Sequence, residues 1–159
     1  MVRHEDYRPG ALDGHDLVVV GPGPGDPRDG SHPKIAAYRH AIDTLLASDQ
    51  PFLAVCLGHQ VLCDRLGIPL AYKDIVFQGT QSPVDLFGRH ERVGFYNTFV
   101  ARAGDEELPD GVEVEADPET GDIHLVRGPH FRGIQFHAES ILTQHGYDLI
   151  HDLVRDLVQ

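Results

Sequence analysis

The chain has 159 residues, which is enough for one domain with its own hydrophobic core. Its 13 basic and 25 acidic residues give a formal net charge of −12, which argues against nucleic acid or a membrane surface as the main partner. The length predicts a single domain over residues 1–159. The two cysteines, and the lack of a signal peptide or a long apolar run, predict that it lies in the reducing cytoplasm.

The first elements in chain order are a polar, irregular segment over residues 1–16 and a buried strand over Leu17–Val20. The glycine- and proline-rich loop Gly21–Pro27 follows directly. It is a poor phosphate loop, because Pro22 and Pro24 lack N–H groups and no Gly-Lys-Ser/Thr follows. It is either an ordinary turn or a stiff loop that presents fixed N–H donors, as an oxyanion site requires.

A strand and two helices are predicted next. Pro33 opens a helix with one apolar face, formed by Ile35, Tyr38, Ile42, Leu45 and Leu46. Phe52–Val55 is a short apolar run typical of a strand buried on both faces. Leu57–Leu66 then has helical spacing, and Gly67 ends that helix. The order strand, helix, strand, helix implies a parallel sheet with right-handed crossovers.

Cys56 lies at the joint between the second strand and its helix. This position resembles the nucleophile elbow of hydrolases, and the positive end of the helix favours a thiolate there. A buried, inert cysteine is the alternative interpretation. Cys63, about two helical turns further on, cannot be bridged to Cys56 and is expected to fill the core.

After Gly67 the pattern changes to short strands separated by Gly, Pro and Asp. The sequence predicts strands over Ile75–Phe77, Phe95–Arg102, Val112–Ala116 and Ile123–Val126, with a hairpin connection over Asp117–Asp122. We expect these to form a smaller, partly antiparallel layer. A buried strand over Gly133–Phe136 and an amphipathic helix from Tyr147 to Leu157 complete the chain.

The second cluster of reactive side chains is His137 and Glu139, directly after the last predicted strand. In an extended backbone, residues two apart point to the same side, so the carboxylate can fix the imidazole tautomer and stabilise its charge. Together with Cys56 they make a Cys–His–Glu triad plausible. An ordinary surface histidine is the alternative. The remaining histidines form no metal-binding spacing, and His59 is expected to pack locally.

Three motifs in this order, GPGPGDP, AVCLGHQ and QFHAES, resemble the class I (triad) glutamine amidotransferase family over residues 17–155. Within that family, Phe77–Phe99 is most similar to the amidotransferase part of phenazine-type synthases that convert chorismate to anthranilate or 2-amino-2-deoxyisochorismate. The resemblance implies an α/β, flavodoxin-like fold: an open, mostly parallel sheet with helices on both faces and a small antiparallel layer. It implies no metal and no cofactor.

The resemblance also implies roles for particular residues. Cys56 would be the nucleophile, His137 the acid–base residue and Glu139 its orienter, while Gly23 and Leu57 would supply the oxyanion N–H groups. The set that would bind the rest of the substrate is Gly25, Gln60, Thr98 and Phe99. The substrate would be L-glutamine, and the ammonia would pass to a chorismate-binding synthase subunit or domain.

One feature departs from the family pattern. The family begins with a strand, a helix and a second strand, but only sixteen residues precede Leu17, and one β–α–β unit needs about thirty. We therefore expect an amino-terminally shortened domain that lacks the first such unit and has an apolar sheet edge. Two alternatives stay open: a catalytically impaired docking partner of a synthase, and a cysteine hydrolase or peptidase acting on another amide. The loop Gly21–Pro27, together with Gln60, Thr98 and Phe99, favours glutamine over another amide as substrate. The sequence does not determine which product the synthase makes.

Overall fold

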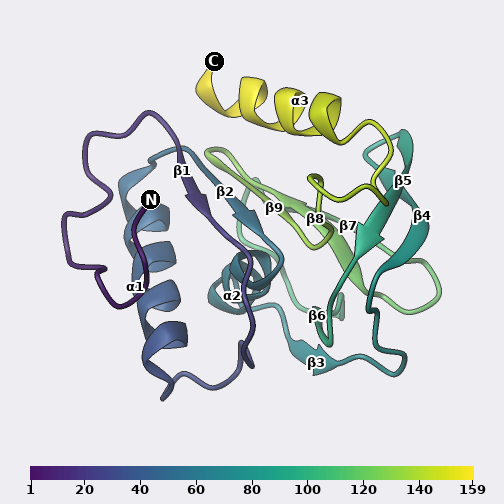
Figure 1. Cartoon of the computed structure of the whole chain (residues 1–159), viewed down its shortest axis with the longest axis horizontal. Coiled ribbons are helices and arrows are strands. Elements are labelled where there is room, and N and C mark those ends of the chain that lie inside the picture. The colour runs from purple at the N-terminus through teal and green to yellow at the C-terminus, as the bar shows by residue number, and fades with distance from the viewer.

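The computed structural model describes residues 1–159 (Figure 1). The elements are β1 Val18–Val20, α1 Pro33–Ser48, β2 Phe52–Val55, α2 Leu57–Arg65, β3 Leu70–Tyr72, β4 Thr80–Leu86, β5 Arg89–Phe95, β6 Phe99–Ala101, β7 Glu113–Ala116, β8 Ile123–Arg127, β9 Phe131–Ile134 and α3 Gly146–Val158. None of the helices has the length and apolar character needed to span a bilayer.

The central sheet has five strands in the order β1-β2-β9-β8-β7. Strands β1, β2 and β9 are parallel, whereas β8 and β7 extend the sheet in antiparallel fashion. The expected α/β fold is confirmed, with the parallel part limited to three strands. In the parallel register Ala54 lies opposite Gly133, so β2 and β9 end at the same edge of the sheet. Open α/β sheets place their ligands at that edge.

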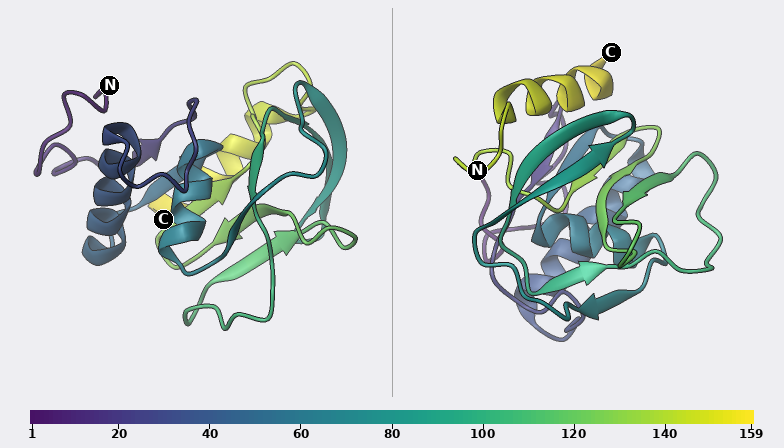
Figure 2. Two further views of the ribbon diagram at one scale, coloured as in Figure 1. Left: turned by 90° about the horizontal axis from the view of Figure 1, so that it is seen from below. Right: turned by 90° about the vertical axis from the view of Figure 1, so that its right-hand side faces the viewer.

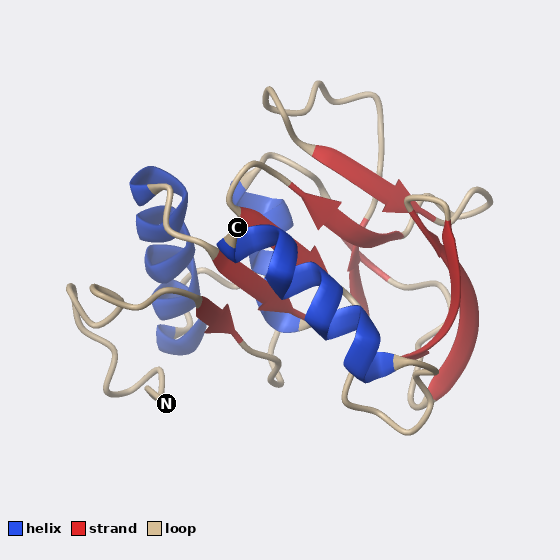
Figure 3. Cartoon of the chain, turned by 90° about the horizontal axis from the view of Figure 1, so that it is seen from above, coloured by secondary structure: helices blue, strands red, loops and turns tan.

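Helices cover both faces of this sheet, as expected. Helices α1 and α2 pack on one face and α3 lies across the other (Figure 3). Strand β2 shows how the faces divide, because Phe52 and Ala54 enter the core under α1 and α2, while Leu53 and Val55 enter the core under α3. All four side chains are buried, which is why this strand reads as a continuous apolar run.

The antiparallel layer differs from the expected one. Ile75–Phe77 is not a strand, and Ile75 is 75% exposed. The main antiparallel unit is instead the hairpin β4–β5, at the end of the molecule remote from α1 (Figure 2). The pattern missed it because only one face is buried and polar residues dominate the rest. Its buried face packs against β8 and β9 in the core under α3.

Two further strands have different bounds from those predicted. The single strand expected over Phe95–Arg102 is interrupted, because β5 ends at Phe95 and β6 begins at Phe99. The strand expected over Gly133–Phe136 is β9, which begins and ends two residues earlier. Both shifts place polar groups at element ends: Asn97 and Thr98 in the first gap, and Gln135 directly after β9.

Strand β1 is the first strand of the chain and forms one edge of the sheet. Its central residue, Val19, is 57% exposed. Residues 1–16 form only turns and bends, as expected, and run near this edge. The Gln50 side chain holds them by donating hydrogen bonds to the carbonyls of Leu12 and His15, both at 2.9 Å.

Candidate active site

Cys56 lies on a strained turn between β2 and α2. Its backbone angles are φ 52° and ψ −102°, outside the conformations that side-chain-bearing residues favour. The turn is held by the hydrogen bond from the Cys56 N–H to the Ile134 carbonyl, at 2.8 Å. It also requires glycine next to it, because a Cβ on Gly58 would lie 2.3 Å from the Val20 carbonyl oxygen. The predicted elbow is therefore present.

The Cys56 thiol is 7% exposed, and burial raises its pKa to about 11. The Leu57 N–H and the Gln135 amide act in the opposite direction, while the Glu139 carboxylate raises the pKa further. The helix end favours a thiolate, as expected, but desolvation outweighs it. At neutral pH the sulfur is protonated and needs a base.

His137 and Glu139 form the expected pair, with 2.7 Å between Nδ1 and Oε1. The pair arises from a turn rather than from an extended backbone, since the Ser140 N–H donates to the His137 carbonyl at 3.2 Å. Because Nδ1 faces the carboxylate, Nε2 is the nitrogen available for proton transfer. No direct hydrogen bond joins His137 to Cys56. Cys56 directly follows β2, and His137 lies three residues after the end of β9, the adjacent parallel strand.

The end of the β4–β5 hairpin holds the backbone of His137. The His137 N–H donates to the Gly94 carbonyl at 2.9 Å. The buried Thr143 hydroxyl donates to the His137 carbonyl at 2.6 Å and accepts from the Gly94 N–H at 2.9 Å. The Tyr96 ring stands edge-on to the imidazole, with 5.3 Å between centroids. The sequence pattern does not predict these supports, since they come from the β4–β5 hairpin, whose apolar signal is weak.

The predicted oxyanion residues lie next to each other. A Cβ on Gly23 would be 3.7 Å from the Leu57 side chain and 2.6 Å from the Lys34 ammonium nitrogen, so the loop passes close to the start of α2. Helix α1 braces this loop. Lys34 donates to the Pro24 carbonyl at 2.7 Å, and Tyr38 donates to the Gly21 carbonyl at 3.2 Å. The loop is therefore supported along most of its length.

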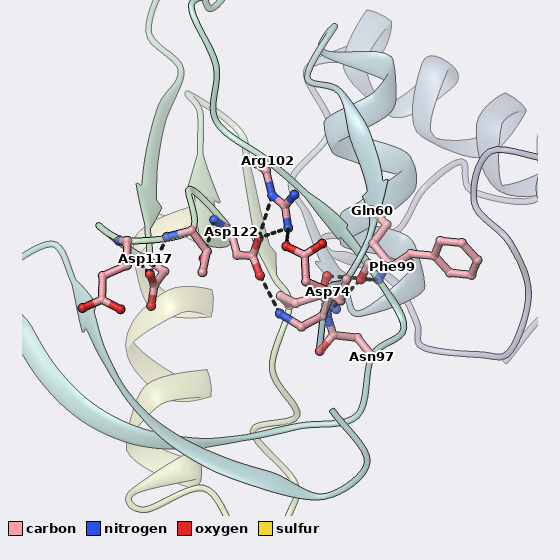
Figure 4. Close-up of polar contacts among 11 residues, drawn as sticks. Gln60, Asp74, Asn97, Phe99, Arg102, Asp117 and Asp122 are labelled. Carbon is pink, nitrogen blue, oxygen red and sulfur yellow. Dashed lines mark hydrogen bonds and ion pairs between the residues drawn. The ribbon is translucent and has the colours of Figure 1, made fainter. Parts of the chain in front are cut away.

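Gln60 and Phe99, two of the predicted substrate-binding residues, are in direct contact (Figure 4). The Gln60 amide nitrogen donates to the Phe99 carbonyl at 2.7 Å, and Asn97 donates to the same oxygen at 2.8 Å. The Thr98 carbonyl accepts from the Lys73 N–H at 2.8 Å. These carbonyls are thus occupied within the chain, and the Gln60 side-chain oxygen is the group left to meet a ligand.

Gly25, in the loop Gly21–Pro27, has a positive φ of 140°, which favours glycine. The same loop continues to Arg28, whose guanidinium carbon lies 4.8 Å from the centroid of the Phe99 ring. Arg28 is oriented by Asp26, with an ion pair of 2.8 Å. The loop Gly21–Pro27 and the Phe99 segment (residues 97–99) therefore approach each other. This contact brings together residues more than seventy positions apart in the sequence.

A cluster of ion pairs next to β3 and β6 anchors the Phe99 segment (Figure 4). Lys73 is 7% exposed and is paired with Asp122, which also binds Arg102 at 2.9 Å. Because a lone buried charge is far more costly than a paired one, the cluster ties β3 and β6 to the turn before β8. No group of three His, Cys, Asp or Glu side chains is arranged to hold a metal ion.

The family description "Glutamine amidotransferase class-I" matches residues 2–157 of the chain. The chain belongs to this family. It is 54% identical over 149 residues to the phenazine-specific anthranilate synthase of Pseudomonas fluorescens and 52% identical to that of Pseudomonas chlororaphis. These matches cover 91% of the chain but 23% of each relative, so the chain spans about a quarter of their length.

A relative of more similar size is the aminodeoxychorismate synthase component 2 of Klebsiella aerogenes. It is 34% identical over 141 residues, which are 84% of this amidotransferase chain and 72% of the relative. Among solved structures, a glutamine amidotransferase from Thermotoga maritima superposes with a TM-score of 0.71 at 21% identity, covering 85% of this chain and 61% of that one. The structural match confirms the fold.

Proposed function

We propose that this amidotransferase hydrolyses L-glutamine at Cys56 and delivers the ammonia to a chorismate-using synthase, as a subunit or as a domain of one. The observation that carries the proposal is the strained elbow at Cys56 after β2, together with the His137–Glu139 pair after β9, the adjacent parallel strand. The names of the relatives support an anthranilate or aminodeoxychorismate synthase as partner, and the aminodeoxyisochorismate synthase rests on the resemblance of residues 77–99 alone. Two cores that share one sheet support a single domain over residues 1–159, and the two free thiols support a cytoplasmic location.

The first chemical step forms the sulfur–carbon bond. His137 Nε2 removes the proton from the Cys56 thiol, and the sulfur attacks the side-chain amide carbon of glutamine. The carbonyl oxygen becomes an oxyanion that accepts hydrogen bonds from the N–H groups of Gly23 and Leu57. One such donor lowers the barrier by about 3–4 kcal/mol.

The second step breaks the carbon–nitrogen bond. Protonated His137, stabilised by Glu139, gives its proton to the departing nitrogen, and ammonia leaves a γ-glutamyl thioester on Cys56. His137 then takes a proton from water, whose oxygen attacks the thioester. Returning that proton to sulfur releases glutamate and restores the thiol.

The remaining polar groups are suited to the main-chain end of glutamine. The free Gln60 side-chain oxygen is an acceptor for the α-ammonium group, and the Gly25 N–H is a donor for the α-carboxylate. Thr98 and Phe99 form the facing wall. This set would distinguish free glutamine from a glutamine inside a peptide, which lacks both charges.

The test is glutamine hydrolysis together with covalent labelling. Cys56→Ser is expected to release no ammonia while melting near the wild-type temperature. A chloroketone analogue of glutamine should label Cys56, as located by peptide mass spectrometry, and the control Cys63→Ala should be labelled equally. Labelling of Cys63 with Cys56 unmodified would overturn the assignment.

The rival functions give different results in the same assay. A docking partner without activity would release no ammonia from glutamine, with or without an anthranilate or aminodeoxyisochorismate synthase added. A hydrolase for another amide would be indifferent to the synthase and would not distinguish glutamine from simple amides. We expect ammonia release that needs glutamine and rises when the synthase is present.

A further inference from the structure

Gln135 is a buried amide that touches the nucleophile and has no role in the steps above. It is 1% exposed and follows β9 directly. Its Nε2 donates to Cys56 Sγ at 3.6 Å, and its Oε1 accepts from Gln60 Nε2 at 3.0 Å. Its backbone N–H donates to the His124 carbonyl at 2.9 Å, which sets the depth of the side chain in the core. Both ends of this amide are therefore engaged.

The surrounding contacts determine which end of the amide faces the sulfur. The Phe99 carbonyl can only accept, so Gln60 must direct its NH₂ group toward it. The same NH₂ group meets Gln135, so the Gln135 atom on that side must be the oxygen. The Gln135 NH₂ group is then left to face Cys56. A donor at the sulfur thus follows from a backbone carbonyl two side chains away.

We propose that Gln135 is a positioning residue, whose amide holds the Cys56 sulfur by a hydrogen bond and connects it through Gln60 to the Phe99 segment. This proposal rests on the proposed function, because it assumes that the Cys56 sulfur reacts with glutamine bound beside Gln60.

The two hydrogen-bond donors at the Cys56 sulfur have different roles in the proposed reaction. Besides Gln135, the Leu57 N–H also acts on the Cys56 thiol. That N–H is needed for the oxyanion once the sulfur attacks, which leaves Gln135 as the donor that can stay on the sulfur. Hydrogen bonds to an ionised partner are about twice as strong as neutral ones, so this contact favours the thiolate over the thiol.

The connection also reaches the substrate end of the site. Gln60 spends both of its N–H groups on Phe99 and Gln135, and its oxygen is the proposed acceptor for the α-ammonium group. A ligand that shifts Gln60 therefore shifts the donor that orients Gln135. Correct binding of glutamine and correct placement of the sulfur become coupled through two buried, hydrogen-bonded side chains.

The experiment compares Gln135→Met with Gln144→Met, a matched substitution at an exposed position where the backbone N–H, not the side chain, makes a hydrogen bond. The rate of carboxamidomethylation of Cys56 by iodoacetamide is followed against pH, without glutamine, by peptide mass spectrometry. We expect Gln135→Met to raise the Cys56 pKa by about one unit, which lowers the rate below the pKa about tenfold. Gln144→Met should follow the wild-type profile.

A folded Gln135→Met protein, shown by its circular dichroism melt, with an unchanged alkylation profile would overturn the proposal. If that variant does not fold, Gln60→Met decides, because it leaves Gln135 in place without its orienting donor. Slower alkylation of Cys56 would then support the proposal, and a wild-type profile would overturn it.

The same variants separate this proposal from the proposed function. If alkylation shifts as expected but wild type releases no ammonia from glutamine, only the proposed function fails. If wild type is active and Gln135→Met keeps both its kcat and its alkylation profile, only the positioning role fails. A purely structural role would lower the melting temperature without moving the pH profile.

Discussion

Acid should destabilise this chain through His59, in the first turn of α2. The ring is fully buried, and burial lowers its pKa from 6.5 to about 4. The carbonyls of Ile123 and Gly133 oppose this shift, and nearby His124 adds to it. Unfolding exposes the imidazole to water, where it binds a proton below about pH 6.5. Between these two values, only the unfolded chain holds the proton.

The magnitude follows from the two pKa values. A group whose pKa is lowered in the folded state contributes stability that is present above the unfolded value and lost as pH falls through the folded value. For His59 the loss between pH 7 and pH 5 is about 2 kcal/mol of unfolding free energy, at about 1.4 kcal/mol per pKa unit. A complete loss, below pH 4, would be about 3 kcal/mol.

The assay is urea unfolding followed by circular dichroism at pH 7, 6 and 5, on wild type and on His59→Gln. Glutamine does not titrate, so the variant should lose about 2 kcal/mol less than wild type over this range, whatever its stability at pH 7. Parallel pH dependences for the two proteins would refute the reasoning and would mean that His59 is protonated, or hydrated, in the folded state.

Three other substitutions have expected outcomes. Glu139→Gln should lower kcat for glutamine at least about tenfold with little change in KM, because the carboxylate contacts only His137; steady-state ammonia release measures both. Thr143→Val should cost about 1–3 kcal/mol of unfolding free energy in urea titrations and lower kcat, since the Gly94 N–H loses its partner and the His137 carbonyl loses one of its two donors. Gly58→Ala should cost at least about 1–3 kcal/mol by the same measurement, whereas Gly21→Ala, with open space and an ordinary φ, should cost much less.

Local patterns were sufficient where the physical cause is local. The apolar run Phe52–Val55 and the helical spacing after it placed the elbow at Cys56, because burial on two faces and a stop at Gly67 can be seen in sixteen residues. The His137–Glu139 contact was also predicted, although a turn rather than an extended backbone produces it. The β4–β5 hairpin was missed, since one-sided burial leaves a weak apolar signal.

Contacts between distant segments were beyond the reach of the sequence. Gln135 is a lone polar residue in an apolar run, a signal that could have been noticed, but its partners Cys56 and Gln60 lie 79 and 75 positions away. The same holds for Thr143, which meets Gly94 across 49 positions. No spacing rule connects residues that are brought together only by the packing of separate strands.

By itself, the sequence determined the family, the α/β elements around Cys56 and the chemical types gathered in three motifs. The tertiary structure decided the protonation state of Cys56. A helix terminus suggested a thiolate, but the depth of Cys56 beneath the facing elements raises its pKa to about 11. The cause is desolvation, which depends on how much water the whole fold excludes from the sulfur and therefore has no expression in the residues next to it.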